Sequence, residues 1–465
     1  MRRRRGWWVV AVALGGCAEA GAAGSRPGSA TDSGADGPAS GGDPAGGAGG
    51  TSGSGGTSGS GGASGSGGTS GSGAAGGASG AGGTAGSGGS AGGAASAGAG
   101  GTAGAGGTGG GGDAGPGLWV MGYYPGYQQA LAPLSEVDLG ALTHLAVGAA
   151  LPRSDGTLDD EFYLGSSGAA FATEIVQRAH AAGAQAILMV GGAGTHDPFV
   201  AAAQPAIRAT FVQNLLALVD RHGFDGLDLD WEPLPAAELP ALTALAAALR
   251  AARPALTLTV PIQPINVNFE VPSSEHAALA ANVDQLNLMS YGVGMAGNWP
   301  GWESWHSSPL HGEGASHPTS IESSIDAYVA AGVPAARLGL GIGFYGICYG
   351  SPVTAPRQVV GAASFEADDN QLGYATLMGA YFEPAARSWD SIAQVPWLAY
   401  SSPRGALGCT YVSYEDAESI LAKGAWAKQR GIGGAIVWTI NEGHLPSAPA
   451  GQRDPLLAAL RAGFR

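Results

Sequence analysis

Residues 224–232 read Phe224-Asp225-Gly226-Leu227-Asp228-Leu229-Asp230-Trp231-Glu232, a stretch in which acidic and apolar side chains alternate. Alternate residues of a β-strand point to the same face, so the pattern predicts a strand with two different faces. One face carries the carboxyl groups of Asp228, Asp230 and Glu232, and the other is apolar. An apolar face under helices and a polar face turned inward are expected of a strand in an α/β barrel.

The chain on both sides of this strand repeats the same alternation of short apolar runs and longer helical segments. In one helical segment, 207–221, Phe211, Leu215, Leu216 and Val219 recur at helical spacing and form one apolar face. The eight predicted strands are 118–124, 142–149, 186–191, 226–231, 256–262, 285–291, 338–344 and 435–439. Eight such alternations predict a parallel (β/α)8 TIM barrel.

The interval between the seventh and eighth predicted strands is much longer than the others. It runs from about residue 345 to about residue 430, so we expect an insertion there, before the last helix. The predicted barrel, residues 117–465 with this insertion, is long enough to bury one large core.

The first residues resemble a bacterial export signal. Arg2 to Arg5 form a basic start, residues 6–14 are mostly apolar and too short to span a bilayer, and Leu14-Gly15-Gly16-Cys17 resembles a lipobox. We therefore expect residues 1–17 to be a signal peptide with a lipid anchor on Cys17. The alternative is an ordinary signal peptide cut at residues 18–23, with Cys17 incidental.

Residues 18–116 consist mainly of Gly, Ser, Ala and Thr, with almost nothing to bury. This composition predicts a disordered linker, and a chain of this kind has a root-mean-square span of about 50–60 Å. It would hold the barrel away from a membrane. The expected location is therefore outside the cytoplasm, either anchored at the cell surface through the lipid or secreted.

Charge and cysteine content restrict the function further. A formal net charge of −15 disfavours nucleic acid as a partner and is compatible with a neutral polysaccharide. Besides Cys17 the chain has only Cys348 and Cys409, which we expect to pair in an oxidising compartment; two unpaired buried thiols are the alternative. Cysteine and histidine show no ligand spacing, so neither a metal nor a cofactor is expected.

Three carboxyl groups confined to one face of a barrel strand indicate catalysis. They repel one another and are desolvated, so at least one pKa must rise. An exposed acidic strand is disfavoured by the apolar residues between them, and a calcium site by their collinear arrangement, which does not wrap an ion. Asp225 has the opposite strand parity and is expected to be structural.

The run Asp225-Gly226-x-Asp228-x-Asp230-x-Glu232 matches the D-G-x-D-x-D-x-E signature of family 18 glycoside hydrolases, the chitinase family, and it lies in the fourth predicted strand as in that family. The resemblance extends over nearly all of residues 118–465. Its other segments are Gly122-Tyr123-Tyr124, Thr143-His144-Leu145, Gly191-Gly192, the run from Gln285 to Tyr291, the run from Gly341 to Gly346, and the run from Gly433 to Trp438.

The resemblance implies a retaining mechanism with one catalytic carboxyl group. Glu232 would protonate the glycosidic oxygen, and the 2-acetamido oxygen of the substrate would attack the anomeric carbon to give an oxazolinium ion. Asp230 would orient the acetamido group and stabilise its positive charge. Asp228 would share a proton with Asp230 and help to keep Glu232 protonated.

The resemblance also implies the residues around the sugar. Tyr291 would hydrogen-bond the acetamido oxygen, Trp438 would form an apolar floor, and Tyr123 would be a wall of the pocket. Met289 and Gln285, from the same predicted strand as Tyr291, complete the predicted substrate-binding set. For Trp438 the alternative is plain barrel core, and for Met289 it is packing beside the pocket.

Three positions depart from the family pattern. Met189 stands where serine usually supports the buried aspartate, Gly292 stands where aspartate is common, and Pro233 stands where tyrosine is usual. The loop 298–305, which holds Trp299, Trp302 and Trp305, is either a sugar-binding rim or an anchored loop.

The expected substrate is a β-1,4-linked polymer of N-acetylglucosamine, most simply chitin. The same chemistry on peptidoglycan or on the chitobiose core of N-glycans is an alternative, because the mechanism requires only a 2-acetamido sugar. A non-catalytic carbohydrate-binding barrel is a further alternative. Family members that lost catalysis typically lost the glutamate, which is retained here as Glu232.

Overall fold

The structure is a computed structural model that describes residues 117–265, 271–294, 303–312 and 319–465. The predicted signal peptide, Cys17 and the predicted linker lie outside these residues. In the described part of the chain, no helix combines the length and apolar character needed to cross a membrane.

Eight parallel strands form a closed barrel, as predicted. They are β1 (Trp119–Pro125), β2 (His144–Pro152), β4 (Gln185–Gly192), β5 (Gly226–Trp231), β6 (Thr257–Ile262), β7 (Gln285–Leu288), β8 (Leu338–Gly343) and β14 (Gly434–Trp438). Each pairs in parallel with the next, and β14 pairs with β1 to close the ring. The short strand β3 (Leu158–Asp159) adds to β2 in the antiparallel direction.

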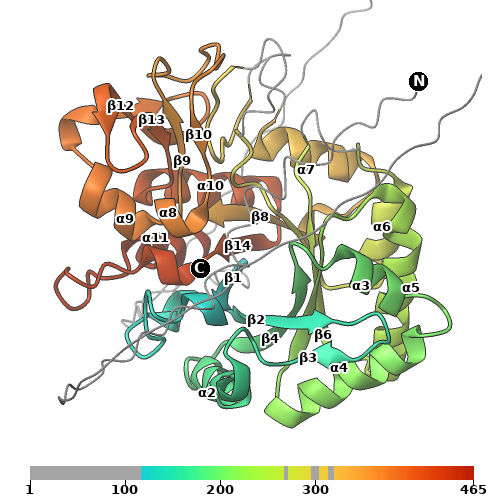
Figure 1. Cartoon of the computed structure of the whole chain (residues 1–465). Helices are drawn as coiled ribbons and strands as arrows, with labels where there is room; N and C mark the ends of the chain where they lie inside the picture. Colours follow the sequence, from blue (N-terminus) through green and yellow to red (C-terminus); the bar gives the residue numbers. More distant parts are fainter. Residues whose placement is uncertain (1–116, 266–270, 295–302, 313–318) are drawn as a thin grey trace, which may run out of the picture. The chain divides into compact units, whose positions relative to one another are not determined.

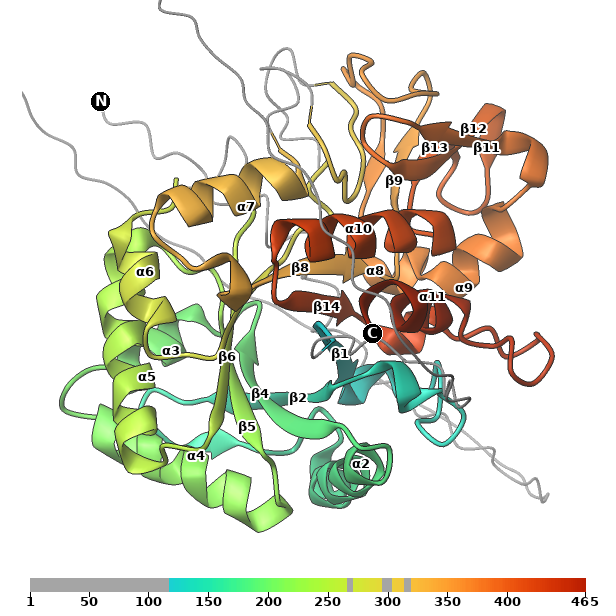
Figure 2. The same cartoon turned by 180° about the vertical axis from the view of Figure 1, so that it is seen from behind.

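Helices cover the outside of the ring (Figures 1 and 2). They are α2 (Gly168–Ala181), α3 (His196–Ala202), α4 (Arg208–His222), α5 (Leu239–Ala252), α6 (Ser274–Ala280), α7 (Ile321–Ala330), α10 (Ala417–Arg430) and α11 (Pro455–Phe464). Helix α4 buries Phe211, Leu215 and Val219 as predicted, but Leu218 is buried in place of Leu216. The helix ends at Gly223, whose φ of 79° lies in the left-handed region that glycine favours.

The connections contain short helical turns. They are η2 (Gly126–Gln128), η3 (Leu139–Ala141), η4 (Gly165–Ser167), η5 (Ala236–Glu238), η6 (Ala335–Arg337), α8 (Asp369–Leu372), α9 (Tyr374–Thr376), η7 (Leu377–Tyr381), η8 (Pro384–Ala386) and η9 (Ile440–Gly443).

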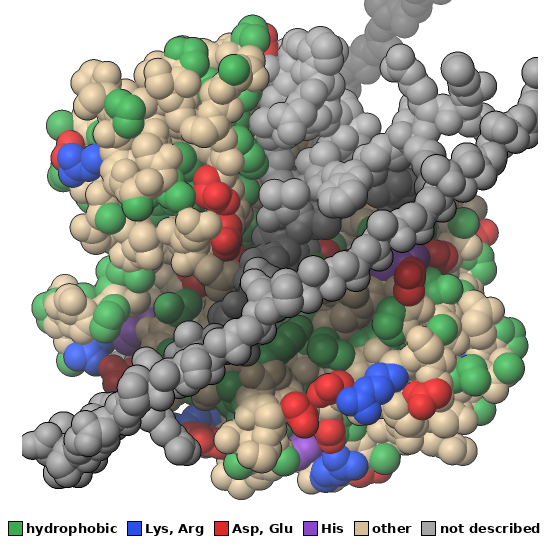
Figure 3. Space-filling view, viewed as in Figure 1, with side chains coloured by type: hydrophobic (Ala, Val, Ile, Leu, Met, Phe, Trp, Pro, Cys, Tyr) green, Lys and Arg blue, Asp and Glu red, His purple; other side chains and the backbone are tan. Residues whose placement is uncertain are grey.

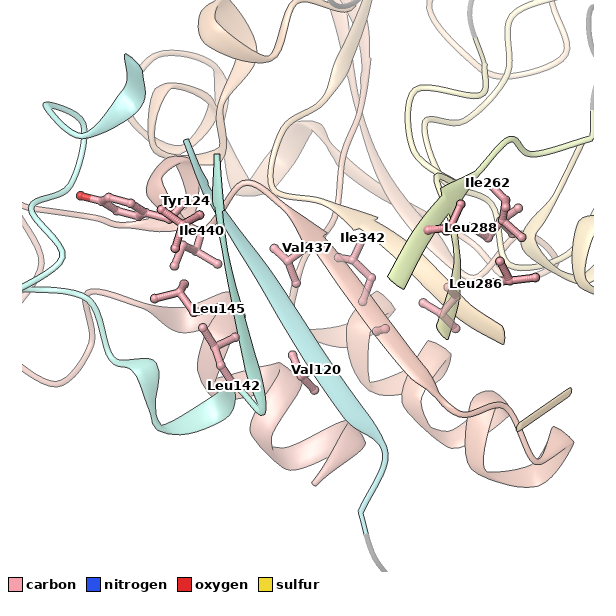
Figure 4. Packing of buried hydrophobic residues seen from close by; sticks show 14 of the residues in the cluster. Val120, Tyr124, Leu142, Leu145, Ile262, Leu286, Leu288, Ile342, Val437 and Ile440 are labelled. Carbon is pink, nitrogen blue, oxygen red and sulfur yellow. The ribbon is translucent and has the colours of Figure 1, made fainter. Parts of the chain in front are cut away.

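Strand alternation divides the core into two clusters. Outward residues such as Val120, Leu145, Ile342 and Val437 pack under the helices (Figure 4). Inward residues, among them Met121, Ile187, Met189, Ile436 and Trp438, fill the inside of the barrel.

Strand β5 follows the same division. Its Leu227, Leu229 and Trp231 belong to the outer cluster, while Asp228 and Asp230 have the opposite parity. Burying each of these apolar side chains contributes about 2 kcal/mol. That contribution fixes the register of β5, because a shift by one residue would turn the carboxyl groups toward the helices.

A five-stranded antiparallel sheet occupies the long interval after β8. Its strands are β9 (Ile347–Gly350), β10 (Phe365–Glu366), β11 (Arg387–Asp390), β12 (Val395–Arg404) and β13 (Cys409–Ser413), in the order β10-β9-β13-β12-β11. The sheet stands to one side of the barrel (Figure 1, orange). It ends before the predicted limit near residue 430, because the last part of that interval forms α10.

Cys348 and Cys409 form a disulfide that joins β9 to β13, and both side chains are buried. The bond closes a loop with a sequence separation of 61 residues. Constraining a loop of that length in the unfolded chain stabilises the folded state by about 4 kcal/mol.

The double replacement Cys348→Ser with Cys409→Ser is therefore expected to lower the midpoint of denaturant unfolding markedly. Reductant should bring the wild-type midpoint down to a similar value and leave the variant unchanged. Equal midpoints for the oxidised wild type and the variant would show that the bond contributes no stability.

Candidate active site

The three predicted carboxyl groups come together inside the barrel at the carboxyl end of β5. Asp228, Asp230 and Glu232 are only 0%, 3% and 7% exposed. Burial is the largest cause of a raised pKa in all three: about 6 for Asp228, about 7 for Glu232, and well above the ordinary range for Asp230.

Asp228 is the member whose charged form is best stabilised. The hydroxyl group of Tyr123 donates to its Oδ2 at 2.8 Å, and the hydroxyl group of Thr259 donates to its Oδ1. Both hydrogen bonds lower the pKa of Asp228 against the effect of burial. Tyr123, predicted as a pocket wall, therefore serves first as a support for this carboxylate.

Thr259 was not predicted, and it compensates for one departure from the family pattern. Asp228 lies opposite Met189 of β4 on one side and opposite Thr259 of β6 on the other. The hydroxyl group expected at position 189 is thus supplied from the other neighbouring strand. A polar side chain of inward parity in the predicted strand 256–262 was the available signal.

Asp230 lies between the other two carboxyl groups. A hydrogen bond between its side chain and that of Glu232 raises the pKa of Asp230 and lowers the pKa of Glu232, and the charges of both neighbours raise the pKa of Asp230 further. This direction puts a proton on Asp230. Its Oδ1 is buried without a hydrogen-bond partner among the described residues, so it is available to a bound ligand.

A cleft opens beside Glu232. Its empty volume, which includes space open to solvent, is about 420 Å³. Its lining includes Tyr127, Tyr163, Met189, Ala193, Glu232 and Trp438. Tyr127 and Tyr163, which sequence reasoning missed, meet edge to face with ring centroids 5.4 Å apart and provide aromatic surface for a sugar ring.

The Gly191-Gly192 pair lets the backbone approach the acids closely. Both residues have positive φ, 100° and 105°. A Cβ atom on Gly191 would lie 2.3 Å from the carbonyl oxygen of Asp230. Glycine is therefore required where this strand passes the carboxyl groups.

Trp438 forms part of the cleft wall, at the end of the last barrel strand. Its ring lies 5.4 Å from that of Tyr123, and its Nε1 donates to Oδ2 of Asp369 at 2.6 Å. Asp369, from the α8 turn of the insertion, was not predicted either, because nothing in the sequence places residues 369 and 438 together.

Tyr291 lies close enough to the acids for all three charges to raise the pKa of its hydroxyl group, after the larger effect of burial and the effect of Tyr345. Met289 packs against the inner cluster beside it. The neighbouring Gly292 has φ of 64°, and a Cβ atom there would lie 3.0 Å from the hydroxyl oxygen of Tyr345. An aspartate at this position, common in the family, would press its Cβ atom against the Tyr345 hydroxyl group and would have to adopt a φ that glycine favours.

The structure does not bring Gln285 to the cleft. It lies at the amino end of β7, where its Nε2 is 3.3 Å from Nε2 of His144 and its Oε1 accepts a hydrogen bond from Asn287. Gln285 and Tyr291 share a strand face in the sequence, but six residues of extended chain separate the two ends of a barrel. The predicted substrate contact is thus corrected to a support inside the barrel.

The remaining candidates are placed as follows. Asp225 accepts hydrogen bonds from the backbone of Ala186 and from His180, as expected for a structural residue. Trp305 is fully buried, and its Nε1 donates to the carbonyl oxygen of Thr319, which supports loop anchoring for this residue. Trp299 and Trp302 lie outside the described residues. Pro233 is partly buried beside Glu232.

No group of three or more His, Cys, Asp or Glu side chains suited to a metal ion occurs in the part of the chain that the structure describes. The side chains that the structure brings together at this site are carboxyl and hydroxyl groups in a desolvated cleft with aromatic walls.

Comparison with known proteins gives a consistent result. The sequence model described as "Glycosyl hydrolases family 18" matches residues 119–443. An endochitinase of Manduca sexta is 29% identical over 292 residues, 56% of this chain and 50% of that protein. Chitotriosidase-1 of Mus musculus is 30% identical over 311 residues, 59% of this chain and 62% of that protein.

The chain thus spans between half and two thirds of the length of these two relatives. Among solved structures, a chitinase of Rhizomucor miehei superimposes with a TM-score of 0.61 at 22% identity, over 74% of this chain and 99% of that one. This likeness concerns the fold.

Proposed function

The chain belongs to family 18 of the glycosyl hydrolases, and on that premise we propose that it hydrolyses β-1,4 linkages in polymers of N-acetylglucosamine, most simply chitin. The observation that carries this proposal is the Asp230–Glu232 pair. Burial raises the pKa of Glu232 to about 7, and Asp230 beside it keeps one buried carboxyl oxygen that has no partner among the described residues. A proton donor and a free polar group are thus available to one bound sugar.

Glu232 is the proposed acid and base of a substrate-assisted mechanism. A carboxylate nucleophile would have to lie about 5 Å from the acid, across the sugar. Asp230 instead hydrogen-bonds Glu232 on the same strand face. In the proposed mechanism the acetamido oxygen of the substrate is the nucleophile, and Oδ1 of Asp230 binds the acetamido N–H as the oxazolinium ion forms.

Tyr291 and Trp438 would hold the reacting sugar. The Tyr291 hydroxyl group would bind the acetamido oxygen in line for attack, and the Trp438 ring would support the apolar face of the sugar. The surface charge agrees with a neutral polymer. On the face seen in Figure 3, the described acidic and basic side chains are scattered rather than gathered in one extended basic patch.

The experiment that tests the function is hydrolysis of chitin oligomers by the full chain, with partially deacetylated oligomers as the matched comparison. Only linkages that follow an acetylated sugar should be cleaved, and the first product should keep the β configuration. Binding without cleavage would favour the carbohydrate-binding alternative. Faster cleavage of peptidoglycan or of the N-glycan core would change the proposed substrate and leave the proposed mechanism unchanged.

The activity is expected to fall as the pH rises. Glu232 must be protonated to act as an acid, and its pKa is about 7 in the folded protein against an ordinary value of 4.5. The three carboxyl groups titrate together, so the alkaline limb of kcat/KM, which reports the free enzyme, should show one apparent pKa near 7 that belongs to the set. A flat profile from about pH 6 to about pH 9, in protein that stays folded, would contradict this.

We also propose that the protein is exported and anchored through a lipid on Cys17, because a lipobox-like sequence follows a basic and apolar start. In a bacterial host, a radioactive fatty acid should label the full chain and should not label Cys17→Ala. Equal labelling of the two would exclude this anchor.

A further inference from the structure

We propose that Asp369 is a positioning residue of the active site, which acts by holding the indole ring of Trp438 against the bound sugar. The inference rests on the proposed function and adds to it. It gives the insertion between β8 and β14 a role in the active site, because Asp369 belongs to that insertion.

The contact is specific and buried. Nε1 of Trp438 donates to Oδ2 of Asp369 at 2.6 Å, and the two residues are 8% and 5% exposed. An indole N–H is a donor only, so its single hydrogen bond fixes the rotation of the ring about the side-chain bonds. The ring itself belongs to the cleft wall with Glu232, whereas Asp369 is absent from that wall.

Gln128, from the η2 turn, forms hydrogen bonds with the residues that follow Trp438 and Asp369 in the sequence. Its Oε1 accepts from the hydroxyl group of Thr439, the residue after Trp438, at 2.5 Å. Its Nε2 lies 3.2 Å from Oδ1 of Asn370, the residue after Asp369. The η2 turn after β1, the α8 turn and the residue after β14 are thus tied together around the Trp438–Asp369 bond.

A buried acid completes the network. Nε2 of Gln128 also donates to Oε1 of Glu442 at 2.8 Å. Burial and the neighbouring charge of Asp369 raise the pKa of Glu442 well above its ordinary range, which favours its neutral form. Burial also raises the pKa of Asp369, to about 6, so at neutral pH the negative charge lies on Asp369, where it strengthens the hydrogen bond from the indole N–H.

The α8 turn does not need the hydrogen bond between Asp369 and Trp438 in order to form. The adjacent Asp368 already caps the α8 turn, since its side chain accepts from the backbone N–H of Asn370. Asp369 instead places its second oxygen on a side chain 69 residues away in the sequence.

The test is a double-mutant cycle on kcat/KM for chitin oligomers, with Asp369→Leu and Trp438→Phe. Leucine keeps most of the volume and removes the acceptor, and phenylalanine keeps a ring and removes the donor. Each single variant should lose on the order of tenfold, because a buried hydrogen-bonding group is left unpaired or the ring is left free to rotate. The double variant should lose little more than either one, since both changes remove the same bond.

The conservative variant Asp369→Asn keeps one acceptor oxygen for the indole N–H, although its NH2 group then faces the N–H donors of Asn370, and it should restore part of the activity lost in Asp369→Leu. Asp368→Asn, in the same turn, keeps a side-chain acceptor for the backbone N–H of Asn370; it is the matched control and should leave kcat/KM unchanged. Additive losses in the cycle, or an Asp369→Leu enzyme as active as the wild type, would overturn the proposal. Thermal unfolding shows whether Asp369→Leu is folded. If it is not, the test rests on Trp438→Phe, and full activity in that variant would also overturn the proposal. An inactive wild type would instead refute the proposed function itself.

Discussion

Glu232→Gln is expected to lower kcat on chitin oligomers by about 10³-fold while leaving oligomer binding largely intact. Glutamine preserves the size of the side chain and its contact with Asp230, but it has no proton to give to the leaving oxygen. Steady-state kinetics together with binding of an uncleaved oligomer separate the two effects. The matched control is Glu238→Gln, a glutamate of the following turn that bonds His196 outside the cleft; its kcat should be unchanged.

The same variant should be more stable than the wild type at neutral and alkaline pH. The folded pKa of Glu232 is about 7 against an ordinary 4.5, so the folded protein binds this proton more tightly than the unfolded chain does. Wild-type stability therefore falls as the pH rises from about 4.5 to about 7, and the glutamine variant escapes that loss. An unfolding midpoint equal to that of the wild type above pH 7, or retained turnover, would reject the assignment of the acid.

Asp230→Asn is expected to lower kcat by about 10²-fold. Asparagine fits the space, but it has no acidic proton to pass to Asp228, so it cannot become the carboxylate that stabilises the oxazolinium ion. The loss should be smaller for a substrate with a highly acidic leaving group, because protonation by Glu232 then matters less. Comparing natural oligomers with an aryl glycoside of N-acetylglucosamine measures this difference.

Asp225→Asn is the control on the same strand. Its carboxyl group bonds the backbone of Ala186 and His180 on the outer face of the barrel, so the substitution should affect stability rather than kcat. If Asp225→Asn and Asp230→Asn lost activity equally, the division of the strand into two faces would not account for the chemistry.

Much of this site follows from the sequence because one strand carries it. The alternation in residues 224–232 places Asp228 and Asp230 inside the barrel, and burial of Leu227 and Leu229 in the outer cluster enforces that placement. Likewise, the eight apolar runs are close to the eight barrel strands, since strand–helix repetition leaves few ways to bury them.

Contacts between residues far apart in the sequence were not predictable in the same way. Thr259 reaches Asp228 only because β6 pairs beside β5 in one register, and Asp369 reaches Trp438 only after the insertion folds back. Gln285 illustrates the opposite error. Parity told which face it occupies, but parity does not tell how far along the barrel axis a residue lies.

Because β14 closes the ring against β1, the barrel is completed only after the last strand has been synthesised. Tyr123 supports Asp228 from the first strand, whereas Trp438 comes from the last, and Gln128 is linked to Glu442 across 314 residues. A nascent chain that has not yet released β14 from the ribosome has an open sheet edge and lacks one wall of the cleft. The hydrolase therefore becomes competent only when its final strand docks, and a chain interrupted before residue 434 is expected to be inert and prone to aggregation.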